Sequence, residues 1–221
     1  MVDGGRGACA VMGSNLSGNY YWSGKNGSPG IWHDFMWVFR SQELANQLLD
    51  QAVEPAPHLF HANRFMELVS SCARTCKKEL VLFTGILDPP ETLVRALTAV
   101  VQSGKRFIVY AADGATHCGS SDLRESALLS GGVDVRIHRT KGQNFHIKAW
   151  VVDGEQVWMG SCNLAIRSLT IDEEIMVKYT GNLSYVSDMH KWAYRNSITY
   201  EPKIKRFVLG KILQLLNEGL L

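Results

Sequence analysis

The fold is decided by one stretch of sequence, residues 144–163, which reads NFHIKAWVVDGEQVWMGSCN. The apolar and β-branched residues over 145–152 predict a buried strand that ends in an Asp-Gly turn. Two ionisable residues, His146 and Lys148, interrupt this strand pattern. Because residues two apart in a strand point to the same side, the two side chains are expected to share one face of the sheet and to reach one ligand together.

Strand and helix patterns alternate on both sides of this stretch. Upstream, the sequence predicts strands and intervening helices in a βαβαβ order: strands over 79–86, 106–112 and 133–139, and helices over 88–104 and 121–131. Further elements are predicted at both ends of the chain: strands over 31–39, 156–160 and 173–179, and helices over 41–53, 183–195 and 203–218. This alternation is typical of an α/β protein.

The composition is that of an ordinary soluble globular protein. The chain has 221 residues, of which 46% are hydrophobic and 20% are charged. Its five cysteines have neither C-x-x-C nor zinc-like spacing, so we expect reduced thiols and no metal centre. The sequence has no signal-peptide pattern and no apolar run of membrane-spanning length, which predicts a cytoplasmic or peripheral membrane protein.

Part of the quoted stretch has a second copy near the start of the chain. VDGGRGACAVMGSNL from Val2 aligns with VDGEQVWMGSCNL from Val152, and DFMWVF further on aligns with EIMVKY. Matches in the same order indicate an internal duplication. The first copy keeps four polar residues of the pattern, Asp3, Ser14, Asn15 and Asp34, but the positions of its His and Lys would precede Met1. We therefore expect a remnant of a first half over 1–55 and a complete second half over 56–221.

The polar residues of the second copy are suited to binding a phosphate group. A buried lysine is costly unless an anion compensates its charge, and a histidine can act as nucleophile or proton donor near neutral pH. A phosphodiester would satisfy both His146 and Lys148. Asn163 and Ser161 stand at the end of a predicted strand, where they could donate to phosphate oxygens, and Glu174 could orient the imidazole. His146 and Lys148 taken alone have a simpler interpretation than a functional site. A lone buried histidine is more often a hydrogen-bonded core residue, and a lysine near a strand end usually extends its ammonium group to water.

The full pattern, H-x-K-x4-D followed by G-S-x-N and a downstream Glu, resembles the HKD motif of the phospholipase D superfamily. This resemblance implies a mixed β-sheet flanked by helices and a site in which two HKD units meet. The resemblance also implies that one histidine attacks phosphorus to form a phosphohistidine and that the other protonates the leaving oxygen, without a metal or another cofactor. The resemblance implies that His146 is the catalytic histidine and that Glu174 orients a histidine. It implies phosphate binding by Lys148, Asn163 and Ser161. Asp153 belongs to the catalytic motif, mainly as a structural turn residue.

Softer matches in NLAIRSLTIDEEIMV and in the first-half remnant are similar to the bacterial-type phospholipase D, cardiolipin synthase and phosphatidylserine synthase branch. They imply a phospholipid substrate, hydrolysis or transfer, and peripheral membrane contact. A nucleic acid partner is less favoured, because the formal net charge is only +2. Two alternatives stay open: a homodimeric endonuclease with one HKD unit per chain, and a non-catalytic fragment. In each active form, a first HKD half or a second chain must complete the site.

Overall fold

The computed structural model describes residues 65–113, 120–139, 143–172, 174–180 and 183–201, together with four short strands and residues 42, 43 and 46 in the first quarter of the chain. The predicted helix over 203–218 and most of the helix predicted over 41–53 lie outside the described residues.

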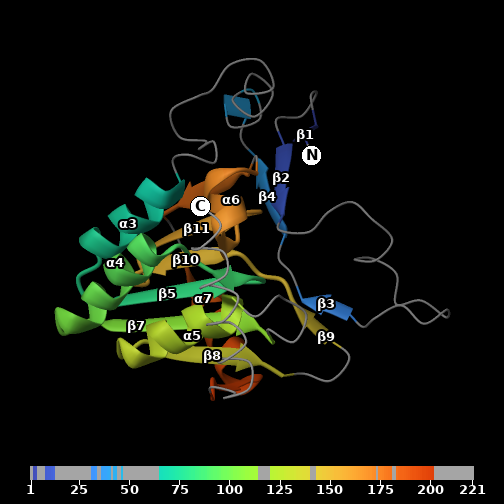
Figure 1. Ribbon diagram of the computed structural model, residues 1–221. Helices are drawn as coiled ribbons and strands as arrows, with labels where there is room; N and C mark the ends of the chain where they lie inside the picture. The colour runs from blue at the N-terminus through green and yellow to red at the C-terminus, as the bar shows by residue number, and fades with distance from the viewer. Residues whose placement is uncertain are drawn as a thin grey trace.

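A seven-stranded mixed sheet forms the centre of the molecule (Figure 1), in the order β13-β11-β10-β5-β7-β8-β14. Its strands are β5 (Glu79–Thr84), β7 (Arg106–Ala112), β8 (Asp134–His138), β10 (Ala149–Val152), β11 (Gln156–Gly160), β13 (Met176–Tyr179) and β14 (Ser197–Thr199). The strands β5, β7 and β8 are parallel, while the remaining neighbours pair antiparallel. The α/β fold with a mixed sheet, predicted from the sequence, is confirmed.

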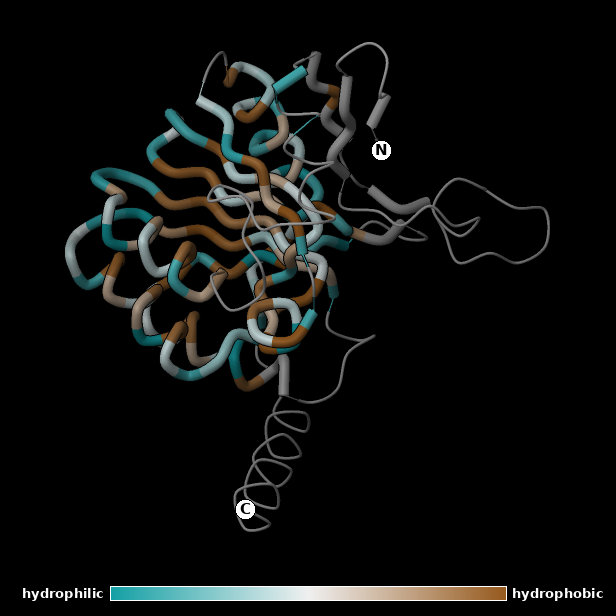
Figure 2. Tube along the Cα trace, turned by 90° about the horizontal axis from the view of Figure 1, so that it is seen from above, coloured by the Kyte–Doolittle hydropathy of each residue, from teal (hydrophilic) through white to brown (hydrophobic). Residues whose placement is uncertain are grey.

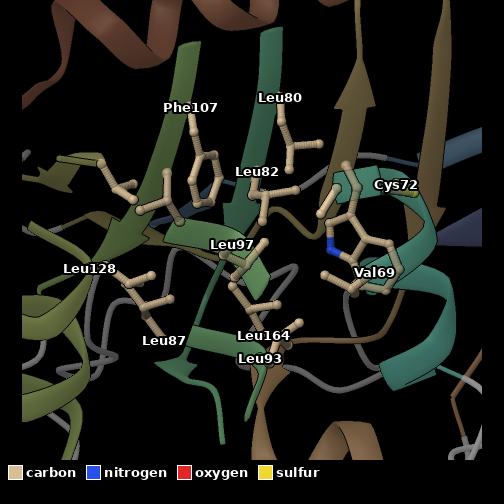
Figure 3. Packing of buried hydrophobic residues seen from close by; sticks show 14 of the residues in the cluster. Val69, Cys72, Leu80, Leu82, Leu87, Leu93, Leu97, Phe107, Leu128 and Leu164 are labelled. Carbon is tan, nitrogen blue, oxygen red and sulfur yellow. The ribbon is translucent and has the colours of Figure 1, made fainter. Parts of the chain in front are cut away.

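Helices cover both faces of this sheet, and each face has its own apolar core. Leu80 and Leu82 of β5 pack with α3 (Phe65–Thr75), α4 (Glu91–Gln102) and α5 (Ser120–Ser130), and Figure 3 shows part of this cluster. Val81 and Phe83 alternate to the opposite face and pack with α7 (Ser184–Arg195). The hydropathy colouring in Figure 2 follows the same arrangement, with apolar strands inside and polar loops at their ends.

Most predicted elements within the described residues are confirmed, but several differ. The strand predicted over 145–152 is split into β9 (Gln143–Phe145) and β10, and 146–148 between them make no ladder. Two short strands, β6 (Leu87–Asp88) and β12 (Leu164–Ala165), pair in parallel beside this break. The helix α3 was not predicted, although its buried residues have helical spacing: Phe65, Leu68, Val69, Cys72 and Ala73.

The strands of the first quarter form two further pairings. β1 (Val2–Asp3), β2 (Ala8–Met12) and β4 (Met36–Arg40) make an antiparallel sheet in the order β1-β2-β4. The aligned second copy has the same order and directions in β10-β11-β13, which supports the proposed duplication. The strand predicted over 31–39 is interrupted, because its first part, β3 (Ile31–His33), pairs in parallel with β9 instead.

Asp153 fixes the turn between β10 and β11 to the start of β5. Its backbone adopts a left-handed φ of 56°, and its carboxylate accepts backbone N–H groups at 2.9 Å from Lys77, 2.7 Å from Lys78 and 3.0 Å from Glu79. Partial burial raises the pKa of this carboxyl. The N–H donors of Glu79, Lys77 and Lys78 together lower it by more, so the net pKa lies below its usual value.

We expect Asp153→Ala to lower the free energy of unfolding by about 2–3 kcal/mol, because it removes several charge-assisted bonds and leaves alanine in a left-handed conformation. Asp153→Asn, which tolerates that conformation, should cost less. Since folding lowers the pKa, the stabilisation is present above the unfolded value of about 3.9 and is lost as the pH falls further. Denaturant titrations between pH 7 and pH 2.5 measure this, with Glu155→Gln on the same turn as the matched control. A difference between wild type and Asp153→Asn that does not shrink below about pH 4 would contradict the assignment.

Candidate active site

The predicted site residues gather where the chain leaves β5 and enters β10. Lys148 is 2% exposed, and its Nζ donates to His146 Nδ1 at 2.6 Å and to the His146 carbonyl oxygen at 2.7 Å. The two side chains are therefore in contact, but the segment that carries them is not part of the strand ladder from which a shared face was expected, and their binding of one ligand stays a prediction. Because a buried ammonium has a high desolvation cost, this position is suited to an anionic ligand.

Asn163 is held at the same place by the backbone of another segment. Its Oδ1 accepts the N–H groups of Gly85 and Ile86, each at 3.1 Å. These two donors fix which side of the amide is oxygen, so the Nδ2 group faces away from them as a donor. A Cβ on Gly85 would lie 3.2 Å from Asn163 Oδ1 and 3.4 Å from His146 Cδ2. Gly85 thus separates Asn163 from His146, and both side chains border this residue.

Ser161 and Glu174 form a second polar pair beside Asn163. The Ser161 hydroxyl donates to Glu174 Oε2, and it accepts the Ile175 N–H at 3.0 Å. The adjacent Gly160 is required by close packing, because a Cβ there would lie 1.7 Å from the carbonyl oxygen of Ile175. The Glu174 carboxylate is thus engaged with Ser161, and its role of orienting a histidine remains a prediction.

Two residues that support the site were not predicted from the sequence. Thr84, at the end of β5, is fully buried, and its hydroxyl accepts the Leu164 N–H at 2.9 Å and donates to the Ile86 carbonyl at 2.6 Å. It therefore ties the segment after Asn163 to the segment that carries Gly85. Both Thr84 and Gly85 are about eighty residues from Asn163 in sequence, so local patterns give no signal for these contacts.

The remaining predicted residues lie elsewhere or outside the described part. Asp153 lies at the opposite end of β10 from His146, in the structural turn role expected for it. Asp3 belongs to β1, while Ser14, Asn15 and Asp34 lie outside the described residues. Cys162, between Ser161 and Asn163, is buried, and desolvation raises the pKa of its thiol, which therefore stays protonated and packs in the core.

We expect Gly85→Ala to lower turnover at least about tenfold while the free energy of unfolding changes by less than about 1 kcal/mol. The added methyl group must displace Asn163 or His146 by a few tenths of an ångström, and small displacements of positioned groups are costly in rate. Thermal unfolding and steady-state kinetics on the same preparation separate the two effects. Unchanged kinetics would show that Gly85 does not position these side chains.

The fold and the site together define a class of protein: an α/β domain in which a buried lysine contacts a histidine, and an asparagine held by backbone N–H groups borders the same glycine as that histidine. A family model described as cardiolipin synthase, PLD-like domain, matches residues 69–195, which include all three residues and Glu174. This is more than half of the chain, and the chain belongs to the phospholipase D superfamily. No curated protein sequence matches the chain.

Solved structures show the same fold at low sequence identity. Phosphatidylserine synthase from Haemophilus influenzae Rd KW20 matches with a TM-score of 0.71 and 14% identity, over 97% of this chain and 68% of that one. Nuc from Salmonella typhimurium, a phospholipase D family member, matches with a TM-score of 0.53 and 18% identity, over 61% and 90%. Polyphosphate kinase from Porphyromonas gingivalis matches with a TM-score of 0.62 and 12% identity, over 99% and 38%. These likenesses concern the fold alone.

Proposed function

We propose that the protein hydrolyses or transfers the phosphodiester of a phospholipid, with His146 as the catalytic histidine. The observation that carries this proposal is the convergence of a buried Lys148, His146 and a backbone-clamped Asn163 on one position. Lys148 and Asn163 are donors, so the position offers hydrogen bonds and positive charge to an anion with several acceptor oxygens. Superfamily membership and the softer sequence matches favour a phospholipid as the source of that anion.

In the proposed reaction, His146 Nε2 attacks phosphorus, the N–P bond forms and the P–O bond to the leaving group breaks. A second histidine gives its proton to the leaving oxygen. Water or an alcohol then attacks phosphorus, the N–P bond breaks, and the proton of the attacking hydroxyl returns to the second histidine. Water gives hydrolysis, and an alcohol gives transfer.

The contact between Lys148 and His146 has a consequence for this reaction. Because Nδ1 accepts from the ammonium, the neutral imidazole carries its proton on Nε2, the atom that must attack. We propose that a bound phosphodiester draws the Lys148 ammonium from Nδ1 to the phosphoryl oxygens. The proton can then move to Nδ1, and the Nε2 lone pair is released toward phosphorus. In the transition state, Lys148 and Asn163 stabilise the charge that develops on these oxygens.

A homodimeric endonuclease is the second candidate, because the 221 residues contain a single H-x-K sequence and two copies of His146 could meet across a dimer. The net charge of +2 argues against it, since binding to nucleic acid depends on neutralising phosphates with Lys and Arg. A third candidate, a non-catalytic fragment, predicts phosphate binding without turnover.

A substrate panel distinguishes these candidates. We expect turnover of phospholipid vesicles, and weak binding to single-stranded and double-stranded DNA at physiological salt. The assays contain EDTA, because the proposed phosphate ligands are Lys148 and Asn163 and the reaction needs no metal. Free head group, phosphatidic acid and the product of transfer to glycerol are quantified together. Tight, salt-dependent DNA binding with cleavage and no effect on lipid would favour the endonuclease, and turnover restored only by added metal would contradict the mechanism.

A further inference from the structure

Thr84 places a hydroxyl group on an otherwise apolar strand face. Residues two apart in β5 share a face, so Thr84 lies on the side of Leu80 and Leu82, which pack in the cluster with α3 and α4. Thr84 is 0% exposed. A valine has nearly the same shape and would bury no polar group here, whereas a buried hydroxyl is costly unless it is hydrogen-bonded. The presence of a threonine is therefore explained by the bonds that its hydroxyl makes.

These bonds are one half of a reciprocal contact between two segments of the site. Asn163 Oδ1 accepts the N–H groups of Gly85 and Ile86, each at 3.1 Å. In the other direction, Thr84 Oγ1 accepts the N–H of Leu164, the residue after Asn163, at 2.9 Å. The same hydroxyl donates to the Ile86 carbonyl oxygen at 2.6 Å. The side chain of Asn163 and the main chain that follows it are thus both bound to the end of β5.

The chain on either side of Asn163 is held by further contacts. Leu164 is aligned with Leu87 where β12 pairs in parallel with β6, and Figure 3 shows both leucines in the apolar cluster. Cys162 Sγ lies 3.4 Å from the Asn163 carbonyl oxygen and 3.7 Å from the Ser168 carbonyl oxygen in α6 (Ile166–Thr170). The Thr84 hydroxyl therefore belongs to a set of contacts that leaves Asn163 little freedom to move.

We propose that Thr84 is a positioning residue for the phosphate-binding amide of Asn163. The inference rests on the proposed function, in which Asn163 Nδ2 donates to a phosphoryl oxygen. Gly85 and Ile86 hold the oxygen of this amide, and Thr84 holds the main chain one residue later. Together they fix the direction of the Nδ2 group. Without the Thr84 hydroxyl, the main chain loses one anchor and Nδ2 shifts relative to the anion, and small displacements of positioned groups are costly.

The first measurement follows the Asn163 side chain in the full chain labelled with ¹⁵N at asparagine. Inorganic phosphate should shift one side-chain NH₂ signal, identified by its absence from Asn163→Ala. Thr84→Val should weaken phosphate binding, measured from this shift, by about tenfold or more. Thr84→Ser keeps the hydroxyl and should stay within about threefold of wild type. Thr84→Cys differs from Thr84→Ser in one atom, and since a thiol is a weak donor and acceptor, it should behave like Thr84→Val.

Ser197→Ala is the matched control for loss of a buried hydroxyl. Ser197 is 9% exposed, and its Oγ accepts from Arg136 Nε at 3.2 Å. It lies on β14, at the edge of the sheet opposite β13, and contacts none of the site residues through these bonds. Its removal should leave phosphate affinity at the wild-type value. Equal phosphate affinity in Thr84→Val and Ser197→Ala would overturn the positioning role, as would a wild-type Asn163 signal that phosphate does not shift.

Turnover gives a readout that a merely structural residue would not change. Thr84→Val should lower kcat/KM by about tenfold or more in the wild-type chain, but by less than about twofold in Asn163→Ala, because no amide is left to position. An equal loss in both backgrounds would overturn the proposal, since a residue that only stabilises the fold acts in both. Phosphate binding that depends on the Thr84 hydroxyl, in a protein without phosphodiesterase activity, would support the positioning role and contradict the proposed function.

Discussion

His146→Ala is expected to lower turnover by at least about 10⁴-fold in whichever preparation of the protein cleaves a phosphodiester. The imidazole forms the covalent bond to phosphorus in the proposed reaction. Without this nucleophile, the phosphohistidine intermediate cannot form and the proposed reaction cannot proceed. His146→Asn should have the same effect, since it keeps a polar side chain of similar size at this half-buried position but cannot form a phosphohistidine. Steady-state kinetics under identical conditions measure both variants.

The covalent intermediate gives a second, independent readout. Rapid acid-free quenching during turnover should trap an acid-labile phosphoryl or phosphatidyl adduct on the wild-type chain, and the adduct should be absent from His146→Asn. His190→Gln is the control for loss of a histidine. His190 lies on α7 against Tyr110, and burial lowers its pKa, so this imidazole belongs to the apolar layer rather than to the site. Turnover within tenfold of wild type in His146→Asn would show that another residue carries the chemistry.

The elements that the sequence predicts well are those with strong local patterns. The core strand Glu79–Thr84 and the helix Glu91–Gln102 carry continuous or periodic apolar residues, so their positions follow from burial alone. The helix Phe65–Thr75 has the same periodicity and was predictable in principle. The break at 146–148 was not, because it depends on β9 pairing with a strand more than a hundred residues earlier.

The same distinction applies to the site. His146, Lys148 and Asn163 lie in one stretch, and the spacing of the motif is sufficient to predict that they act on one ligand. The partner of Asn163 is the backbone of Gly85 and Ile86, and a backbone donor has no residue-type signature. The Ser161 hydroxyl donates to Glu174, thirteen positions later, where the pairing of β11 with β13 decides which groups meet. Tertiary contacts of this kind require the topology.

As a monomer, the 221-residue chain is expected to turn over at least about 10²-fold more slowly than a form with two catalytic histidines. The proposed reaction uses one histidine to attack and another to protonate the leaving oxygen, and each general acid or base step contributes about 10²–10⁴-fold. The sequence holds one H-x-K. His33, in the first quarter of the chain, is a candidate for the second histidine because β3 pairs with β9 next to the motif. This pairing aligns His33 with Phe145 rather than with His146. His33→Ala should therefore leave turnover unchanged.

A graft tests the requirement for a second histidine directly. Residues 144–151, fused to the N-terminal side of Val2, supply a His and a Lys at the same spacing from Asp3 that His146 and Lys148 have from Asp153. The graft should raise monomer turnover by about 10²-fold or more, and the same graft with its His replaced by Ala should not. Mass in solution and phosphodiesterase activity are measured on each preparation. Full activity in an ungrafted dimer would contradict the monomer arrangement and favour two copies of His146 across an interface. Loss of activity in His33→Ala would identify His33 as the second histidine instead, because the reaction needs a proton donor on the far side of phosphorus from the attacking nitrogen.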